Sequence, residues 1–301
     1  MIKHRSYNFF GNLVIVNFPR DVSKSEKKKF AQNLMKKNSA IKTILEKSGN
    51  FKGRLRKMKT SWLAGEKTKE VIYNENGCTF KFDVDETYFS PRLSNERKEV
   101  ASYIKKGENV LVMFAGVAPF PIVIAKNSHA RKVCSNELNK KANQYAELNI
   151  KLNKVVNKVE LIPGDIKKVA EKIKKCWETN LPKKIPPPSS RQETLCLPPL
   201  ETKSKTITYN KKKIPRKFDV IIMPRPQLKD SFLKQAFMLS KKGTRIYYYD
   251  FCKEDEMDKI ANKIKTEAKR YKKKIKILKI KNAGEIAPYK IRCRIDFKIL
   301  N

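Results

Sequence analysis

A run of small residues follows a strongly apolar segment near the middle of the chain. The segment VLVM (110–113) predicts a buried strand, and Ala115, Gly116 and Ala118 follow it before a helix begins. Small side chains at such a turn let a ligand lie against the backbone, and a helix N-terminus favours anionic groups. The run is not a G-x-G-x-x-G pattern, so on its own it also fits an ordinary turn.

Acidic residues stand at the ends of the next two expected strands. Glu137 lies ~20 residues beyond the small-residue turn, where a carboxylate can bind the hydroxyls of a ribose. Asp165 ends the following strand, in the sequence IPGD. Taken singly, Glu137 also fits a helix N-cap acid and Asp165 a Gly-Asp turn. Their order on successive strands favours a pocket for an adenosine-type nucleotide.

The elements that must position these residues alternate between strand and helix from about residue 91 onward. This alternation predicts an α/β fold, with a doubly wound, mainly parallel sheet that has helices on both faces. The last two strands, KIKILKIK and IRCRIDFKIL, have no helix between them, so they predict an antiparallel edge hairpin. Residues 1–90 predict a small α+β domain with a hairpin turn at Asn76-Gly77.

A Pro-rich interruption separates two of the strands of the second domain. It runs from about residue 177 to 217 and holds seven Pro among Ser, Thr and Lys. This composition predicts a flexible insertion within the domain that spans 91–301.

The charge of the chain indicates its partner. Lys and Arg number 69 against 30 Asp and Glu, which gives a net charge of +39. Such an excess predicts a polyanionic partner, most often a nucleic acid. The basic segment around Arg54 and Arg56, interleaved with apolar residues, would lie on the face toward that partner.

Cysteine, histidine and hydropathy patterns limit the other function classes. The six Cys form no C-x-x-C pair, which predicts reduced thiols and a cytoplasmic protein. Two His exclude a His-rich metal site, so we expect no metal. The apolar stretch 110–125 is too short and too rich in Pro and Gly to span a membrane, and the N-terminus does not read as a secretory signal. We therefore expect no membrane association, and a monomer.

Several motifs occur together along most of the chain. They are FGNLVIVNFP, SWLAGE, YNENGCTFKFDVDETYFSPRLSNER, MFAGVAPF, ELNKKANQYAELNIKLNKV and APYKIRCRIDFKI. With them the sequence resembles the archaeal and eukaryotic tRNA (guanine-37 N1)-methyltransferases. The resemblance implies a Rossmann-type class I methyltransferase fold, the cofactor S-adenosylmethionine, and the anticodon stem-loop of tRNA as partner.

The resemblance also implies two catalytic residues. Arg56 matches the family arginine that stabilises negative charge developing at guanine O6, which is what a fixed guanidinium does well. Glu96, in SPRLSNER, matches the general base for guanine N1. Arg56 also fits a phosphate contact, and Glu96 also fits an acid in the first turn of a helix. Phe89, Pro91 and Arg92 belong to the same motif and are expected to shape the pocket.

Further positions carry over to binding roles. Those implied for the cofactor are Phe114, Ala115, Gly116, Pro119, Glu137, Asp165, Ile166, Met223 and Pro224. Those expected to bind the substrate are Arg54, Arg92 and Pro226.

Two departures from the family pattern leave other functions open. Val112 stands where the family usually has Asp, and Ala118 stands where it has Gly, at a backbone position expected to need a positive φ. Three hypotheses follow: methyl transfer to guanine 37, transfer of the aminocarboxypropyl group in wyosine synthesis, and tRNA binding without catalysis. The intact SPRLSNER motif favours methyl transfer.

Overall fold

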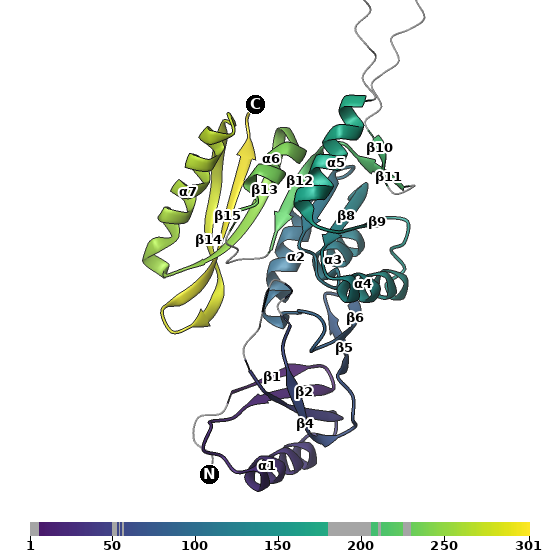
Figure 1. The fold of residues 1–301 in the computed structure, drawn as a ribbon, viewed down its shortest axis with the longest axis vertical. Coiled ribbons are helices and arrows are strands. Elements are labelled where there is room, and N and C mark those ends of the chain that lie inside the picture. Colours follow the sequence, from purple (N-terminus) through teal and green to yellow (C-terminus); the bar gives the residue numbers. More distant parts are fainter. Residues whose placement is uncertain are drawn as a thin grey trace, which may run out of the picture.

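The computed structural model of the chain describes residues 6–49, 53, 55, 57–179, 206–209, 212–224 and 230–301 (Figure 1). The elements of the N-terminal part are β1 (Ser6–Phe10), β2 (Leu13–Asn17), α1 (Lys24–Lys37), β3 (Thr43–Lys47), β4 (Thr60–Gly65), β5 (Glu70–Glu75) and β6 (Cys78–Asp83). The elements that follow are η1 (Pro91–Leu93), α2 (Ser94–Ser102), β7 (Asn109–Met113), α3 (Pro119–Asn127), β8 (Lys132–Glu137), α4 (Lys140–Leu152), β9 (Val159–Pro163), α5 (Ile166–Thr179), β10 (Thr206–Tyr209), β11 (Lys212–Pro215), β12 (Phe218–Met223), α6 (Leu233–Leu239), β13 (Ser240–Cys252), η2 (Glu254–Glu256), α7 (Met257–Arg270), β14 (Ile275–Ala287) and β15 (Lys290–Ile299).

The N-terminal part contains a sheet in the order β1-β2-β3-β4, with α1 against one face. β2 and β3 run parallel, and the other neighbours run antiparallel. The helix begins at a capping box, in which Ser23 and Glu26 bond to each other's backbone N–H. The sheet and the helix agree with the small α+β fold predicted for this part. The short apolar runs of β3 and β4 lie among lysines and lack a clear alternation, so the sequence alone does not indicate these two strands.

A hairpin connects this sheet to the rest of the molecule. Asn76 and Gly77 have φ angles of 50° and 70°, as a two-residue hairpin turn between β5 and β6 requires, which confirms the predicted turn. The outer edge of β6 is covered by two side-chain amides of the α4 region. Asn149 bonds to both backbone groups of Lys81, and Asn153 bonds to both backbone groups of Thr79. These four bonds replace a missing neighbouring strand and fix the hairpin to α4.

The central sheet has the order β14-β15-β13-β12-β7-β8-β9. β13, β12, β7, β8 and β9 are parallel, and β15 and β14 add an antiparallel edge. Val110 and Val112 face the core shared with α2, α3 and α4, whereas Leu111 and Met113 face the core shared with α5, α6 and α7. The predicted doubly wound sheet with an antiparallel edge hairpin is confirmed.

The boundary near residue 90 stays a proposal. Phe10, Phe82 and Phe89 on its N-terminal side pack into the same core cluster as Val100 and Val112 beyond it. The rings of Phe82 and Phe89 are stacked, with centroids 4.6 Å apart. The packing between the two parts is therefore continuous.

The predicted insertion differs from the structure at both of its ends. α5 continues to Thr179, and β10 and β11 pair as an antiparallel hairpin inside the range expected to be flexible. The sequence of β10, Thr-Ile-Thr-Tyr, alternates polar and apolar residues, a short strand pattern that the surrounding Pro-rich composition obscured. Residues 180–205 lie outside the described residues.

Within the described ranges, no helix is both long and apolar enough to cross a bilayer. Cys78, Cys134, Cys252 and Cys293 are buried, and Cys176 is partly buried.

Gly11 marks the closest approach of the β1–β2 turn to β5. Its φ is +57°, and a Cβ there would lie 2.1 Å from the backbone oxygen of Ile72. Gly77 has a similar φ of +70°, but a Cβ there would meet nothing within 4 Å.

We expect Gly77→Ala to lower the free energy of unfolding by about 1 kcal/mol. Gly11→Ala should cost about 1–3 kcal/mol more, because backbone must move. Chemical denaturation of both variants checks this. Equal losses of stability in the two variants would contradict the close approach of Gly11 to Ile72.

Candidate cofactor pocket and the carboxylates beside it

A pocket opens where β7, β8 and β12 end. Its lining residues are Leu55, Tyr88, Phe89, Ser90, Leu93, Arg97, Phe114, Ala115, Gly116, Pro119, Phe120, Glu137, Asn139, Ala142 and Pro224. The carboxyl edge of a parallel sheet is where α/β folds bind their ligands. The structure therefore brings together Phe114, Ala115, Gly116, Pro119, Glu137 and Pro224 of the predicted cofactor residues.

Three other predicted cofactor residues do not line this pocket. Ile166 and Met223 are buried in the core on the opposite face of the sheet. Asp165 accepts a hydrogen bond from the backbone N–H of Lys167 at 3.0 Å, as a cap of α5 does. Asp165 and Ile166 follow the end of β9, and Met223 ends β12, so their predicted role in cofactor binding stays a proposal.

The loop between β7 and α3 has an unusual backbone. Phe114, Gly116 and Ala118 have φ angles of 58°, 59° and 67°. A Cβ at Gly116 would lie 3.2 Å from the backbone oxygen of Tyr88, so the glycine lets the loop approach another pocket residue. The positive φ expected at Ala118 is confirmed, and it costs roughly 1 kcal/mol relative to Gly. Val112 is fully buried in the sheet, paired with Ser135 and Ile222.

Glu137 ties this loop to the end of β8. One carboxylate oxygen accepts the N–H of Gly116 at 2.9 Å, and the other accepts the N–H groups of Leu138 and Asn139, each at 2.8 Å. A carboxylate has about four acceptor positions, so room remains for a hydroxyl donor. With the glycine at the loop and apolar walls from Phe114 and Phe120, these residues fit an adenosine-containing cofactor.

Arg97 of α2 lines the pocket and was missed by sequence reasoning. Its guanidinium pairs with both oxygens of Glu75 and donates to the backbone oxygen of Ser90 at 3.0 Å. It also lies over the rings of Phe89 and Phe120, at 5.1 and 5.8 Å from their centroids. The spacing of Leu93 and Arg97 places them on one face of α2, but only the fold brings Glu75 to them.

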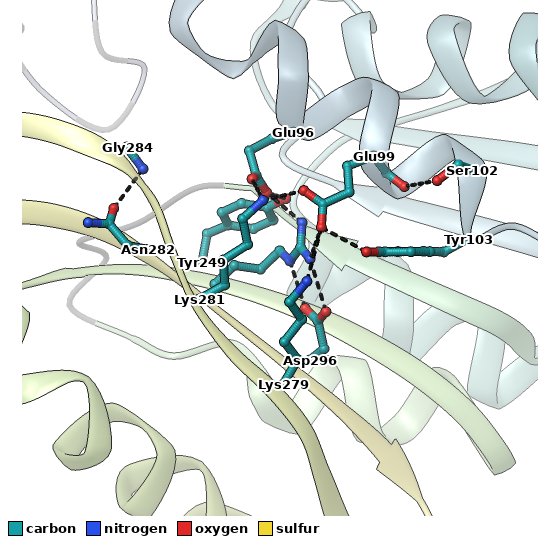
Figure 2. Close-up of polar contacts among 11 residues, drawn as sticks. Glu96, Glu99, Ser102, Tyr103, Tyr249, Lys279, Lys281, Asn282, Gly284 and Asp296 are labelled. Carbon is teal, nitrogen blue, oxygen red and sulfur yellow. Dashed lines mark hydrogen bonds and ion pairs between the residues drawn. The ribbon is translucent and has the colours of Figure 1, made fainter.

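Glu96 lies on the neighbouring face of α2 and is not among the lining residues. It is 4% exposed and faces β13, β14 and β15. Its Oε2 accepts bonds from the Tyr249 hydroxyl at 3.0 Å and from Arg294 Nη1 at 2.6 Å, and its Oε1 accepts from Lys281 Nζ at 2.6 Å (Figure 2). Burial, together with the charge of Glu96, raises the pKa of Tyr249 well above its ordinary value, so its hydroxyl stays a donor.

Arg294 is the centre of the cluster around Glu96. It is fully buried, and it also bonds to Asp296 at 2.9 Å and to Glu99 at 2.9 Å. Lys281 bridges Glu96 and Glu99, and Tyr103 donates to Glu99 at 2.8 Å. Burial alone would raise the pKa of Glu99. Bonds from Lys281, Arg294 and Tyr103 outweigh it and hold that pKa far below its usual range.

The predicted substrate residues are only partly placed. Arg92 in η1 donates to the side-chain oxygen of Asn8 at 3.5 Å, which sets it beside β1 rather than in the pocket. Arg54, Arg56 and Pro226 lie outside the described residues. Leu55, between the two arginines in sequence, lines the pocket.

A protein of Nanoarchaeum equitans is similar to the whole chain. The two are 34% identical over 98% of this chain and 100% of the relative, which is named tRNA (guanine(37)-N(1))/4-demethylwyosine(37)-methyltransferase Taw22. The chain belongs to the TRM5/TYW2 methyltransferase family. Residues 71–176 match the model described as the TRM5/TYW2 methyltransferase domain, and residues 3–68 match that of the TYW2 N-terminal domain.

Solved structures agree with this assignment. The crystal structure of Trm5b from Pyrococcus abyssi has a TM-score of 0.74 and 29% identity, over 98% of this chain and 75% of that one. A complex of aTrm5 with tRNALeu has a TM-score of 0.72 and 25% identity, over 98% and 72% of the two chains. This TRM5/TYW2 protein is thus an S-adenosylmethionine-dependent transferase of a tRNA-modifying family.

The depressed pKa of Glu99 predicts how stability depends on pH. A carboxylate whose pKa is lowered by folding stabilises the protein above its unfolded pKa of ~4.3, and this contribution is lost as the pH falls below it. Glu99→Gln should therefore lower the free energy of unfolding at pH 7 by ~1–3 kcal/mol and flatten its decline in acid. Denaturant titrations across pH check this. The control is Glu147→Gln, at an exposed i,i+4 pair with Lys151, which should change little. If the free energy of unfolding of Glu99→Gln falls in acid as steeply as that of the wild type, the role assigned to the Glu99 contacts is wrong.

Proposed function

We propose that the protein transfers the methyl group of S-adenosylmethionine to N1 of guanine 37 in tRNA. The observation that carries this proposal is the buried carboxylate of Glu96, one residue from Arg97 in the pocket wall. The whole-length similarity to a protein named as a guanine-37 N1-methyltransferase supports it.

Guanine N1 carries a proton at neutral pH, so a base must take that proton before N1 can act as a nucleophile. Glu96 is the residue that we assign to this step, because its carboxylate is withdrawn from bulk water and the adjacent residue Arg97 lines the pocket. Arg56 would stabilise the charge that then spreads to O6. When bound, S-adenosylmethionine supplies an activated methyl group. Phe114, Gly116 and Glu137 would hold it, and the chain's part is positioning and deprotonation.

An exposed aromatic pair on β1 suits an anticodon loop. Tyr7 and Phe9 of β1 are each 44% exposed, and their rings meet edge to face with centroids 5.4 Å apart. Splayed bases of single-stranded RNA stack on such rings. Asn8, between them, contacts Arg92 of the pocket-side motif. The net charge of +39 supplies attraction to the phosphates.

A second candidate function is transfer of the aminocarboxypropyl group from the same cofactor. The match of residues 3–68 to the TYW2 N-terminal domain favours it. Against it stand the intact SPRLSNER motif and the name of the whole-length relative, which describes methyl transfer only.

Two labels of the cofactor separate these functions. One carries the label on the methyl group, and the other carries it in the amino-acid portion. The substrates are two tRNA transcripts that differ only at position 37, with guanine or adenine. We expect methyl label on the guanine transcript alone, mapped to N1, since adenine N1 has no proton to remove. Transfer of the amino-acid label would replace the proposal with aminocarboxypropyl transfer. Transfer of neither label, with tRNA still bound, would leave an RNA-binding role.

A further inference from the structure

The two oxygens of Glu96 have different surroundings. Oε2 is held by Tyr249 and Arg294, whose side chains are almost or fully buried. Oε1 is bonded to Lys281, whose side chain is 29% exposed and reaches in from β14 at the edge of the sheet. Oε2 is therefore fixed by buried residues of the core, whereas Oε1 is covered by the partly exposed side chain of Lys281, which can swing outward into solvent.

The neighbours of Arg294 explain why it cannot follow Lys281 outward. Asp296 on its own strand accepts hydrogen bonds from Nε and Nη2 of Arg294, and Glu99 of α2 accepts a further bond from Nη2. The ammonium group of Lys281 is carried on a flexible four-carbon side chain. The pairing of β14 with β15 shifts register directly after it, from Asn282 onward. Lys279, also on β14, contacts Glu99 at 3.4 Å, whereas Lys281 contacts both Glu99 and Glu96. The charged cluster around Glu96 is built from α2, β13, β14 and β15. Tyr249, Lys281 and Arg294 contact Glu96 itself, whereas Lys279 contacts Glu99 and Asp296 contacts Arg294 (Figure 2).

We propose that Oε1 of Glu96 is the atom that receives the N1 proton, that Arg294 and Tyr249 are positioning residues holding Oε2, and that Lys281 competes with that proton for Oε1. The inference rests on the proposed function. The N1–H bond breaks, its proton passes to Oε1, and its electron pair stays on N1 to form the bond to the methyl carbon. Lys281 keeps its own proton and withdraws from Oε1.

Two cations that touch one carboxylate thus act in opposite directions. Removing Lys281 leaves Oε1 free to receive the N1 proton without first displacing a cation. Removing the fork of Arg294 lets the carboxylate turn, and misplacement by about 1 Å can cost roughly 100-fold in rate. A cluster that served only to hold α2 in place would respond to both changes with a loss.

The test is the single-turnover rate of methyl transfer to the guanine-37 transcript against pH, with saturating tRNA and cofactor. The variants are Lys281→Met and the control Lys279→Met, which removes a cation from Glu99 but not from Glu96. For Lys281→Met we expect the plateau to rise about threefold, because no cation then has to leave Oε1 before the N1 proton arrives. Lys279→Met should reproduce the wild-type profile, and the Kd of cofactor and tRNA should be unchanged in both.

Arg294→Lys is the second arm, because it keeps the buried charge while losing the planar fork. We expect its plateau to fall about 100-fold, with its thermal unfolding temperature measured in parallel. A Lys281→Met profile that matches Lys279→Met, or that falls at every pH, would overturn this inference alone. A wild-type protein that transfers no methyl group would overturn the proposed function beneath it.

Discussion

Two adjacent charges on α2 bind to opposite sides of the molecule. Arg97 pairs with Glu75 of β5, and Glu96 pairs with Arg294 of β15, and the side chains of all four residues are largely buried. A buried ion left without its partner costs roughly 3–5 kcal/mol, so both pairs must form together. This requirement fixes the rotation of α2 about its axis. It holds Leu93 and Arg97 in the pocket wall, while Glu96 on the neighbouring face of the helix contacts β13, β14 and β15.

The rest of the architecture supports that placement. Asn149 and Asn153 hold the β5–β6 hairpin against α4. The hairpin in turn brings Glu75 to Arg97 of α2. At the other side, the long pairing of β13, β15 and β14 places Tyr249, Arg294 and Lys281 next to each other on neighbouring strands. The cofactor pocket lies between these anchored regions, at the end of the parallel strands. The left-handed residues of the 114–118 loop stay in place because Glu137 fixes the backbone of Gly116.

Local patterns in the sequence were sufficient for most elements. The strand–helix alternation and the Asn76-Gly77 turn are local signals, and the structure confirms both. Glu137 and the 114–119 loop were found because strand ends and small residues mark a ligand site in any α/β sheet. The pairs Arg97–Glu75 and Glu96–Arg294 could not be found in this way. They join residues 22 and 198 positions apart, and nothing local in the sequence indicates such partners. For the same reason the inward turn of Ile166 and Met223, away from the pocket, follows only from tertiary packing.

The central claim is that the buried carboxylate of Glu96 takes the N1 proton. The most direct measurement compares the single-turnover methylation rate of Glu96→Gln with that of Asn95→Ala, an exposed neighbour on the same helix. Cofactor and tRNA Kd values and the thermal unfolding temperature are measured on both variants. The amide keeps the shape of the side chain but cannot accept the proton. We expect its rate to fall by at least about 100-fold, with both Kd values within about twofold of wild type. A folded Glu96→Gln protein that methylates guanine 37 at the wild-type rate would contradict the account.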